Sequence, residues 1–415
     1  MKARVWEHCK NALIVLLLCC IIILTLMALP PTVVRSLRLP PEALRLLGVP
    51  AGAEPVPARN AQAAAAQPLL ISVRTETGRS TAQRDFSRLD AMRDRLTPFL
   101  GEGLRTAGAA AKTERSEFYE TMSREGAYFD YGAAMPVSAV CAWLGAENAA
   151  LTGSARHFLL TVHGGAVELY LLGDDCLRCT TGVSARELLE GLAAYTPDGS
   201  AFAAEEDPGV SFDPLMLRET AVTLPNAVAE IPAEDDFAES AATLLNFNPY
   251  GSGTYSDADG NRVFTENSRT LTVSPDGTVV FTDSAEAATG PVAAADTVSA
   301  RIETVRSLAA SIGALVPNDA RLYLCGCEQT GGRTLCRFRY VLDGVPIVPD
   351  ALTAVFTGSA LTELRFSVRT CYTGVSRISL LPLPQAAAIA EPGAYLTAAY
   401  HDSARGTLSA GWIQS

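Results

Sequence analysis

The sequence of 415 residues contains little of what catalytic sites are built from. It has only four histidines and no HExxH, G-x-S-x-G or glycine-rich phosphate-binding motif. Those motifs supply the ligands of a zinc protease, the nucleophile of a serine hydrolase and the phosphate cradle of a nucleotide-binding protein. Carboxylates could still serve as bases. The sequence nevertheless predicts a protein that is not an enzyme and that needs no metal or cofactor.

Positive charge is also scarce relative to negative charge. The chain has 33 Lys and Arg against 45 Asp and Glu, which gives a net charge of −12 and a pI near 4.9. An acidic protein is repelled by the phosphates of nucleic acids and by anionic lipid surfaces. We therefore expect no nucleic-acid partner.

The composition excludes a disordered chain. Hydrophobic residues make up 48% of the sequence and charged residues 19%, which is typical of globular proteins. A chain of this length has room for two or three domains, each with its own core.

Only one hydrophobic run is long enough to cross a bilayer. Residues 12–29 are apolar except for Thr25, and a helix that is apolar on every side prefers lipid to water. The preceding tail, 1–11, carries Lys2, Arg4 and Lys10, and positive charge before a first span favours a cytoplasmic N-terminus. The sequence thus predicts a single-pass protein of the cell membrane with its bulk outside the cytoplasm.

The alternative to a membrane anchor is a cleaved export signal. The apolar run is longer than a usual signal core, no A-x-A cleavage site follows it, and Leu18 stands before Cys19 where a lipoprotein signal needs a small residue. These features favour an uncleaved anchor.

Small residues on this span are the candidate positions for contact with another membrane helix. Close packing of helices in lipid favours small side chains. Ala12 and Cys19 share one face of the helix, and Thr25 and Ala28 share another. Because the two pairs do not form one stripe, the span could also be an anchor and nothing more.

The rest of the chain is predicted to be α+β, with antiparallel sheets each packed by helices. Helical spacing indicates helices at 81–104, 114–124, 136–144 and 297–312, and alternating patterns indicate hairpins. The expected domains are a Pro/Ala-rich linker at 30–68, an N-terminal α+β domain at 69–233, a helix with β-hairpins at 234–294, and a helix-on-sheet domain at 295–415.

Two histidines occur on one predicted strand. His157 and His163 are six residues apart, so they share a face by the period of two. The opposite face, with Phe158 and Leu160, is more apolar, which predicts that both histidines face water or a rim. A metal site would need further ligands near them, and the surrounding sequence offers none.

Seven cysteines lie outside the span and its tail, and an odd number excludes a complete set of internal disulfides. Cys176 and Cys179 form a CxxC that could be a redox pair, half of a zinc site, a local disulfide or two idle thiols. A turn at 329–332 would place Cys325 opposite Cys336, which makes these two the most credible disulfide.

Several segments resemble a family of bacterial regulators. The segment REGAYFDYGAAMPVSAVCAWLG (124–145) is similar to YycH proteins. The segments LLNFNPYGSGTY and RTLTVSPDGTVVFT (within 244–282), CRFRYVLDGVPI (336–347) and the terminal GWI (411–413) are similar to YycI proteins. The resemblance implies one membrane helix and an extracytoplasmic part made of PepSY-like α+β units. It also implies no catalytic residues.

The same resemblance suggests a function. YycH and YycI are accessory regulators of the WalK/WalR (YycG/YycF) two-component system of Gram-positive bacteria, and their membrane helices contact the sensor histidine kinase. The expected partners are therefore a sensor kinase, related single-pass regulators and the lipid bilayer. The alternatives are an extracytoplasmic thiol oxidoreductase using Cys176 and Cys179, and a protein that binds the cell envelope.

Overall fold

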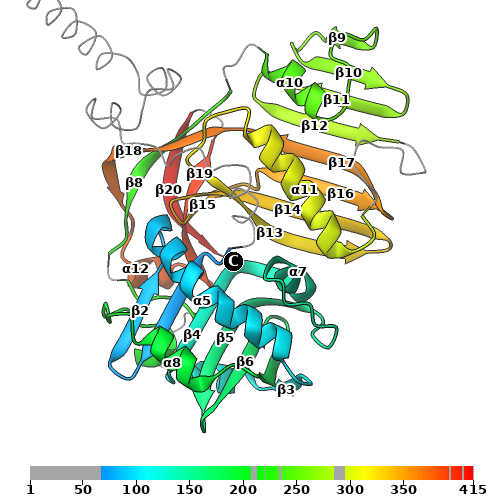
Figure 1. The fold of residues 1–415 in the computed structure, drawn as a ribbon. Coiled ribbons are helices and arrows are strands. Elements are labelled where there is room, and N and C mark those ends of the chain that lie inside the picture. Colours follow the sequence, from blue (N-terminus) through cyan, green and yellow to red (C-terminus); the bar gives the residue numbers. More distant parts are fainter. Residues whose placement is uncertain are drawn as a thin grey trace, which may run out of the picture. The chain divides into compact units, whose positions relative to one another are not determined.

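The computed structural model describes residues 67–206, 213–219, 221–232, 236–284, 295–391, 394–403 and 406–414, all within one compact unit (Figure 1). Its fold is α+β with mostly antiparallel sheets, as the sequence predicts. The predicted span at 12–29, with its candidate contact residues, lies outside the described residues. Within the described ranges, no helix combines the length and the apolar character needed to cross a bilayer.

The first half of the described chain forms a seven-stranded sheet, hereafter the small sheet. All its neighbouring strands are antiparallel, in the order β2-β1-β4-β5-β6-β7-β3. The strands are β1 (Leu70–Thr75), β2 (Gly78–Ala82), β3 (Ala111–Thr113), β4 (Gly126–Pro136), β5 (Ser154–His163), β6 (Ala166–Leu172) and β7 (Cys176–Thr180).

Helices cover this sheet, and α5 crosses it as the longest of them (Figure 1). The helices are α5 (Phe86–Thr106), α6 (Arg115–Thr121), α7 (Val137–Trp143), α8 (Ala185–Leu192) and α9 (Ala203–Glu206). The Asp85 carboxylate caps α5 by accepting the Arg88 N–H at 3.1 Å. The helix begins later than residue 81 because Thr81 and Ala82 pair with β1.

The second half forms a thirteen-stranded sheet, hereafter the large sheet. Its order is β18-β8-β20-β19-β15-β14-β16-β17-β12-β11-β10-β9, with β13 paired to β14 beside this path. The strands are β8 (Thr223–Glu230), β9 (Thr254–Ser256), β10 (Arg262–Glu266), β11 (Arg269–Val273), β12 (Thr278–Asp283), β13 (Arg321–Thr330), β14 (Arg333–Leu342), β15 (Val345–Val348), β16 (Leu352–Thr357), β17 (Ala360–Ser367), β18 (Thr370–Ser379), β19 (Leu396–Asp402) and β20 (Thr407–Gln414).

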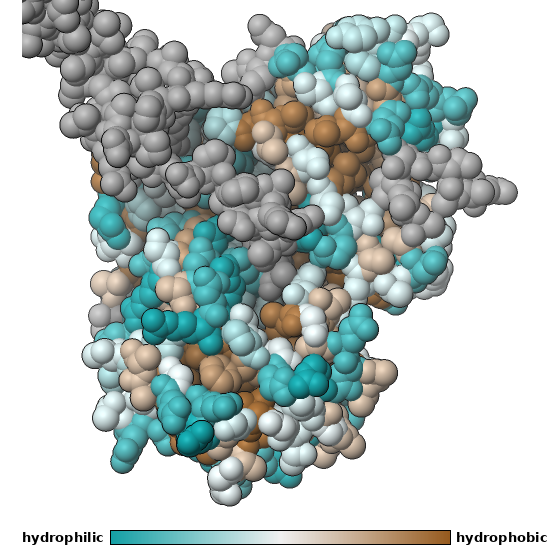
Figure 2. Space-filling model, viewed as in Figure 1, coloured by the Kyte–Doolittle hydropathy of each residue, from teal (hydrophilic) through white to brown (hydrophobic). Residues whose placement is uncertain are grey.

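Three helices accompany the large sheet: α10 (Phe237–Leu244), α11 (Val298–Gly313) and α12 (Leu383–Ala388). The α11 helix lies across the strands (Figure 1). Of the apolar stripe in its sequence it buries Ile302, Val305, Ala309 and Ile312, while Leu308 is partly buried. Figure 2 shows hydrophobic surface gathered near α10 and α11, while the rest of the coloured surface in this view mixes hydrophilic and hydrophobic residues.

The large sheet is continuous across the boundaries expected from the sequence. Strand β12 pairs with β17, so the hairpins within 254–283 belong to the same sheet as the C-terminal strands. Strand β8, placed by the sequence in the N-terminal domain, pairs with β18 and β20. The expected divisions at 233 and 294 therefore do not separate one sheet from another.

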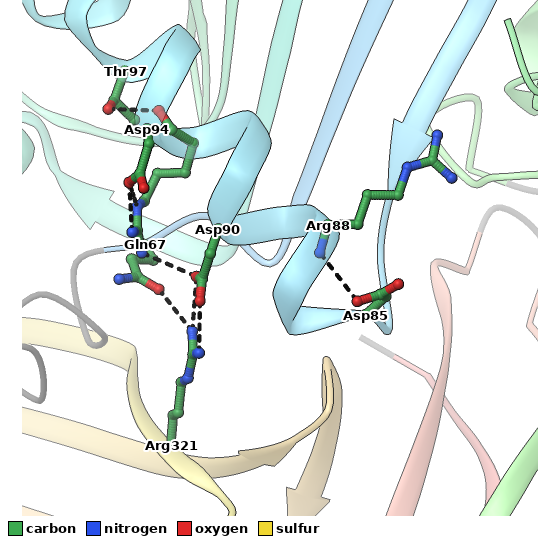
Figure 3. Close-up of polar contacts among 8 residues, drawn as sticks. Gln67, Asp85, Arg88, Asp90, Asp94, Thr97 and Arg321 are labelled. Atoms are coloured by element: carbon green, nitrogen blue, oxygen red, sulfur yellow. Dashed lines mark hydrogen bonds and ion pairs between the residues drawn. The ribbon is translucent and has the colours of Figure 1, made fainter. Parts of the chain in front are cut away.

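Side chains of the two sheets are joined by specific contacts. The Arg321 guanidinium of β13 donates to both carboxylate oxygens of Asp90 on α5, at 2.9 and 2.7 Å, and to Gln67 Oε1 at 3.2 Å (Figure 3). The same guanidinium lies 4.0 Å from the centre of the Phe86 ring. Strand β13 of the large sheet is thereby attached to the helix that covers the small sheet.

Candidate functional site

A cleft of about 380 Å³ in the described residues is lined by several polar side chains together with apolar residues. Its walls come from β4 and β5 of the small sheet, from β13 and β14 of the large sheet, and from the segments around residues 115, 173 and 213. The polar side chains that line it are Arg115, Tyr119, Arg156, His157, Asp213, Cys325 and Arg339. We call this cavity the polar cleft.

A bulge in β4 shapes one wall of the cleft. The pairing of β4 with β5 shifts between Asp130 and Met135. Within this stretch Gly132 has a φ of +77° and donates its N–H to Asp130 Oδ1 at 2.7 Å. This positive φ disfavours any residue with a side chain, and a Cβ there would lie 2.5 Å from Leu69 Cδ1, so the Leu69 side chain would also have to move. The bulge turns the backbone toward the cleft and anchors the Asp130 carboxylate.

Asp130 and Arg156 form a largely buried ion pair in the wall of the cleft. Arg156 donates through Nε at 2.9 Å and through Nη2 at 3.2 Å, and the Tyr395 hydroxyl donates to the same carboxylate at 3.2 Å. Burial opposes ionisation of Asp130. The guanidinium charge and the hydrogen bonds outweigh this effect and lower the pKa of Asp130 to about 2. Arg156 also lies over the Tyr395 ring at 4.1 Å.

His157 is buried, with 7% of its surface exposed, so it does not face open water, although its side chain lines the cleft. Its Nδ1 lies 2.7 Å from the Tyr128 hydroxyl, and the two rings stack. Burial lowers the pKa of His157 to about 4, although the nearby Asp130 carboxylate opposes that change. The imidazole is therefore neutral at pH 7, and its low basicity suits it poorly to proton transfer near that pH.

The burial of His157 has a physical cause. The face of β5 with Phe158 and Leu160 packs into the main core, as the alternation predicts. The other face is also covered, because Leu159 belongs to a second core with Phe118 and Phe202. Periodicity identifies the more apolar face of a strand, but it does not show that the remaining face is exposed. His163, at the end of β5, has a side chain that is 55% exposed, as predicted.

The CxxC cysteines lie within strand β7, not in a loop before a helix. Residues three apart in a strand point to opposite faces. Accordingly, Cys179 packs in the main core and Cys176 packs in the second core. This geometry opposes a local disulfide, a redox pair or a shared metal at these two residues. Within the described ranges, no group of three or more His, Cys, Asp or Glu residues is arranged to hold a metal ion.

We expect Cys176 and Cys179 to be unreactive in the folded protein. Burial raises the pKa of Cys176 to about 11 and also raises that of Cys179, and the thiolate is the reactive form. In the reduced native protein, iodoacetamide should modify partly exposed Cys327 first and these two only after unfolding. Peptide mass spectrometry would measure this order. Prompt modification of both CxxC thiols in the folded state would instead support a thiol-based activity.

The predicted opposition of Cys325 and Cys336 is also wrong. The β13–β14 turn contains two residues, not four, since Thr330 pairs with Arg333 and both Gly331 and Gly332 have positive φ. This tighter turn places Cys336 opposite Cys327. The sequence could have predicted this turn, because a two-residue Gly-Gly loop is typical of tight hairpins.

A bulge at Cys325 separates it further from Cys336. The pairing shifts between Leu324 and Gly326, which leaves Cys325 as the extra residue. Its thiol lies in the polar cleft and donates to Asp350 Oδ1 at 3.3 Å. Cys336 instead packs in the main core. The two thiols therefore belong to different environments.

Two of the four charged side chains that line the cleft form ion pairs, whereas Arg115 is held by carbonyl oxygens and Asp213 Oδ1 accepts the Leu215 N–H. Arg339 donates to Asp350 at 2.8 Å, Arg156 is paired with Asp130, and Arg115 donates to the carbonyl oxygens of Gly173 and Asp174. These groups give the cleft a lining of polar atoms, which is suited to binding a polar group.

Comparison with known proteins adds no assignment, since no family model, curated protein or solved structure matches the chain. The resemblance to YycH and YycI therefore rests on the sequence segments given above.

Proposed function

We propose that this protein is a membrane-anchored, extracytoplasmic accessory regulator of a two-component sensor kinase. The observation that carries the proposal is the composition of the polar cleft, whose lining comes from both sheets. A ligand or partner group bound there would contact His157 of the small sheet and Arg339 of the large sheet together. Binding could then favour one arrangement of these contacts over another, which is what a regulator requires.

The sequence suggests the class of partner, a sensor kinase, and the means of contact, a membrane helix. The apolar span at 12–29 would place one helix of the protein beside the membrane helices of a kinase. Packing there would use the small residues Ala12 and Cys19 on one face, or Thr25 and Ala28 on the other. Contacts from the α+β part would add to this association. The resemblance to YycH and YycI supports the same arrangement.

The geometry of the CxxC thiols favours this proposal over a thiol oxidoreductase that uses Cys176 and Cys179. An enzyme of that kind needs two cysteines close together, with at least one readily ionised. Cys176 and Cys179 lie on opposite faces of β7, and burial raises the pKa of both. These residues therefore do not provide the expected redox centre.

Replacing residues 12–29 with an unrelated apolar helix of equal length should alter the output of the partner kinase while the protein stays in the membrane. The replacement removes the helix surface that the kinase would contact but keeps the hydrophobic length. Transcription from a promoter under the response regulator measures the output, and membrane fractionation measures the location. A crosslink from the native span to the kinase should also be lost.

The matched control restores the four small residues at positions 12, 19, 25 and 28 within the unrelated helix. If these positions form the contact, the control should recover both the crosslink and the native output. Unchanged output in the fully replaced variant, with normal expression, would contradict the proposal and leave the span as an anchor only.

A further inference from the structure

Two thiols face each other across the β13–β14 hairpin. Cys327 and Cys336 are directly paired in the strand register, and their sulfur atoms are 3.9 Å apart. Opposed residues on antiparallel strands have Cα atoms roughly 4.5–5.5 Å apart, and disulfides span roughly 4.4–6.8 Å between Cα atoms. The backbone already lies within the range that a disulfide needs.

Only a small movement would join the two sulfur atoms. An S–S bond is about 2.05 Å long, so the sulfurs must approach by about 2 Å, which rotation of the side chains can supply. The two-residue Gly331-Gly332 turn and the bulge at Cys325 fix the register on either side of the pair. The hairpin therefore holds the two cysteines opposite each other.

The two thiols are chemically unequal. Cys327 is partly exposed, whereas Cys336 is fully buried. The hydrogen bond from the Cys336 thiol lowers the pKa of Cys327 against the effect of burial, and the Arg301 charge lowers it further. Donating that hydrogen bond, together with burial, raises the pKa of Cys336. Cys327 is therefore the thiol that ionises and that an oxidant can reach.

We propose that Cys327 and Cys336 are an oxidisable pair that forms a disulfide between β13 and β14. The oxidant is a small-molecule disulfide such as oxidised glutathione. The Cys327 thiolate attacks one glutathione sulfur, forms a mixed disulfide and releases one glutathione thiolate. Cys336 then loses its proton and attacks Cys327 Sγ, which releases the second glutathione thiolate. The two cysteine thiols are oxidised, one glutathione disulfide is reduced, and the two cysteine protons pass to the glutathione thiolates.

The bond would stabilise one wall of the polar cleft. Cys327 lies two residues after Cys325, whose bulge brings its thiol to the cleft, and Cys336 lies three residues before Arg339. A covalent link here would hold the register of both strands next to the bulge. The pairing does not depend on the proposed regulatory role, because it concerns the purified chain alone.

The test uses the full-length protein purified in detergent and incubated with oxidised or with reduced glutathione. After alkylation and non-reducing digestion, the oxidised sample should contain one peptide pair linked through Cys327 and Cys336. Cys327→Ser and Cys336→Ser should lose this link. Cys325→Ser is the matched control and should keep it, since Cys325 lies outside the pair.

Thermal unfolding provides a second readout. Closing a short loop constrains the unfolded chain, so oxidation should raise the Tm of the wild type and of Cys325→Ser by about 3 °C. It should leave the Tm of Cys327→Ser and Cys336→Ser unchanged. A link between Cys325 and Cys336, a link between two chains, or full alkylation of Cys327 and Cys336 in folded, oxidised protein would each overturn the proposal.

Discussion

Replacing Arg156 with alanine should lower the free energy of unfolding by about 3–5 kcal/mol, because it leaves the Asp130 carboxylate buried without its partner charge. Asp130 is 3% exposed, and the Arg156 side chain is 18% exposed. The remaining hydrogen bonds from Gly132 and Tyr395 cannot replace a guanidinium. Urea denaturation followed by circular dichroism would measure the loss.

A double variant separates the cost of an unpaired charge from the value of the pair. Adding Asp130→Asn to Arg156→Ala should recover part of the loss, because the neutral amide no longer needs a counter-charge. Arg333→Ala is the matched control, since Arg333 and Glu363 form a pair whose side chains are 59% and 58% exposed. The free energy of unfolding of that variant should fall by no more than about 1 kcal/mol. A similarly small loss for Arg156→Ala would show that the buried pair contributes little.

The second large effect is a loss of stability on mild acidification. His157 has a pKa of about 4 when folded, against an ordinary value of 6.5. Between these values the unfolded chain binds a proton that the folded chain does not, so the stability of the folded state falls as the pH falls from 6.5 to 4. Through His157 alone, the free energy of unfolding should fall by about 2 kcal/mol at pH 5 and by about 3 kcal/mol below pH 4.

His157→Gln should flatten this pH dependence even if it lowers stability overall. Between pH 6 and pH 5 the slope of unfolding free energy against pH should decrease by about 1 kcal/mol per pH unit. His163→Gln is the control, because that side chain is more than half exposed at the end of the same strand. Asp130 does not interfere, since its pKa is lowered to about 2 and its own contribution is lost only below about pH 4. An unchanged slope in His157→Gln would contradict the burial of a neutral imidazole.

The local elements of the fold could be predicted from the sequence. The helices α7 and α11 match the ranges 136–144 and 297–312 expected from the spacing, and β5 and β6 form one of the expected hairpins across Gly164-Gly165. Each of these signals lies within a few neighbouring residues, where spacing and backbone preference decide the outcome. The α+β class follows from the same local patterns.

The polar cleft could not be predicted in the same way. Its walls combine Arg156 and His157 with Cys325 and Arg339, which are more than 160 residues apart in the sequence. For two of these residues the sequence predicted a different environment. His157 lies on the less apolar face of its strand, which predicted contact with water or a rim. Cys325 was expected opposite Cys336, which holds only if the turn contains four residues.

The sequence by itself therefore determined the acidic composition, the apolar run at 12–29, and the identity of most helices and hairpins. These depend on composition and on periodicity over short stretches. The tertiary structure alone decided that both faces of β5 are covered, that β12 pairs with β17, and that Cys327 meets Cys336. Burial of a second face and pairing of distant strands depend on segments far apart in the chain, and a bulge of one residue changes which side chains meet.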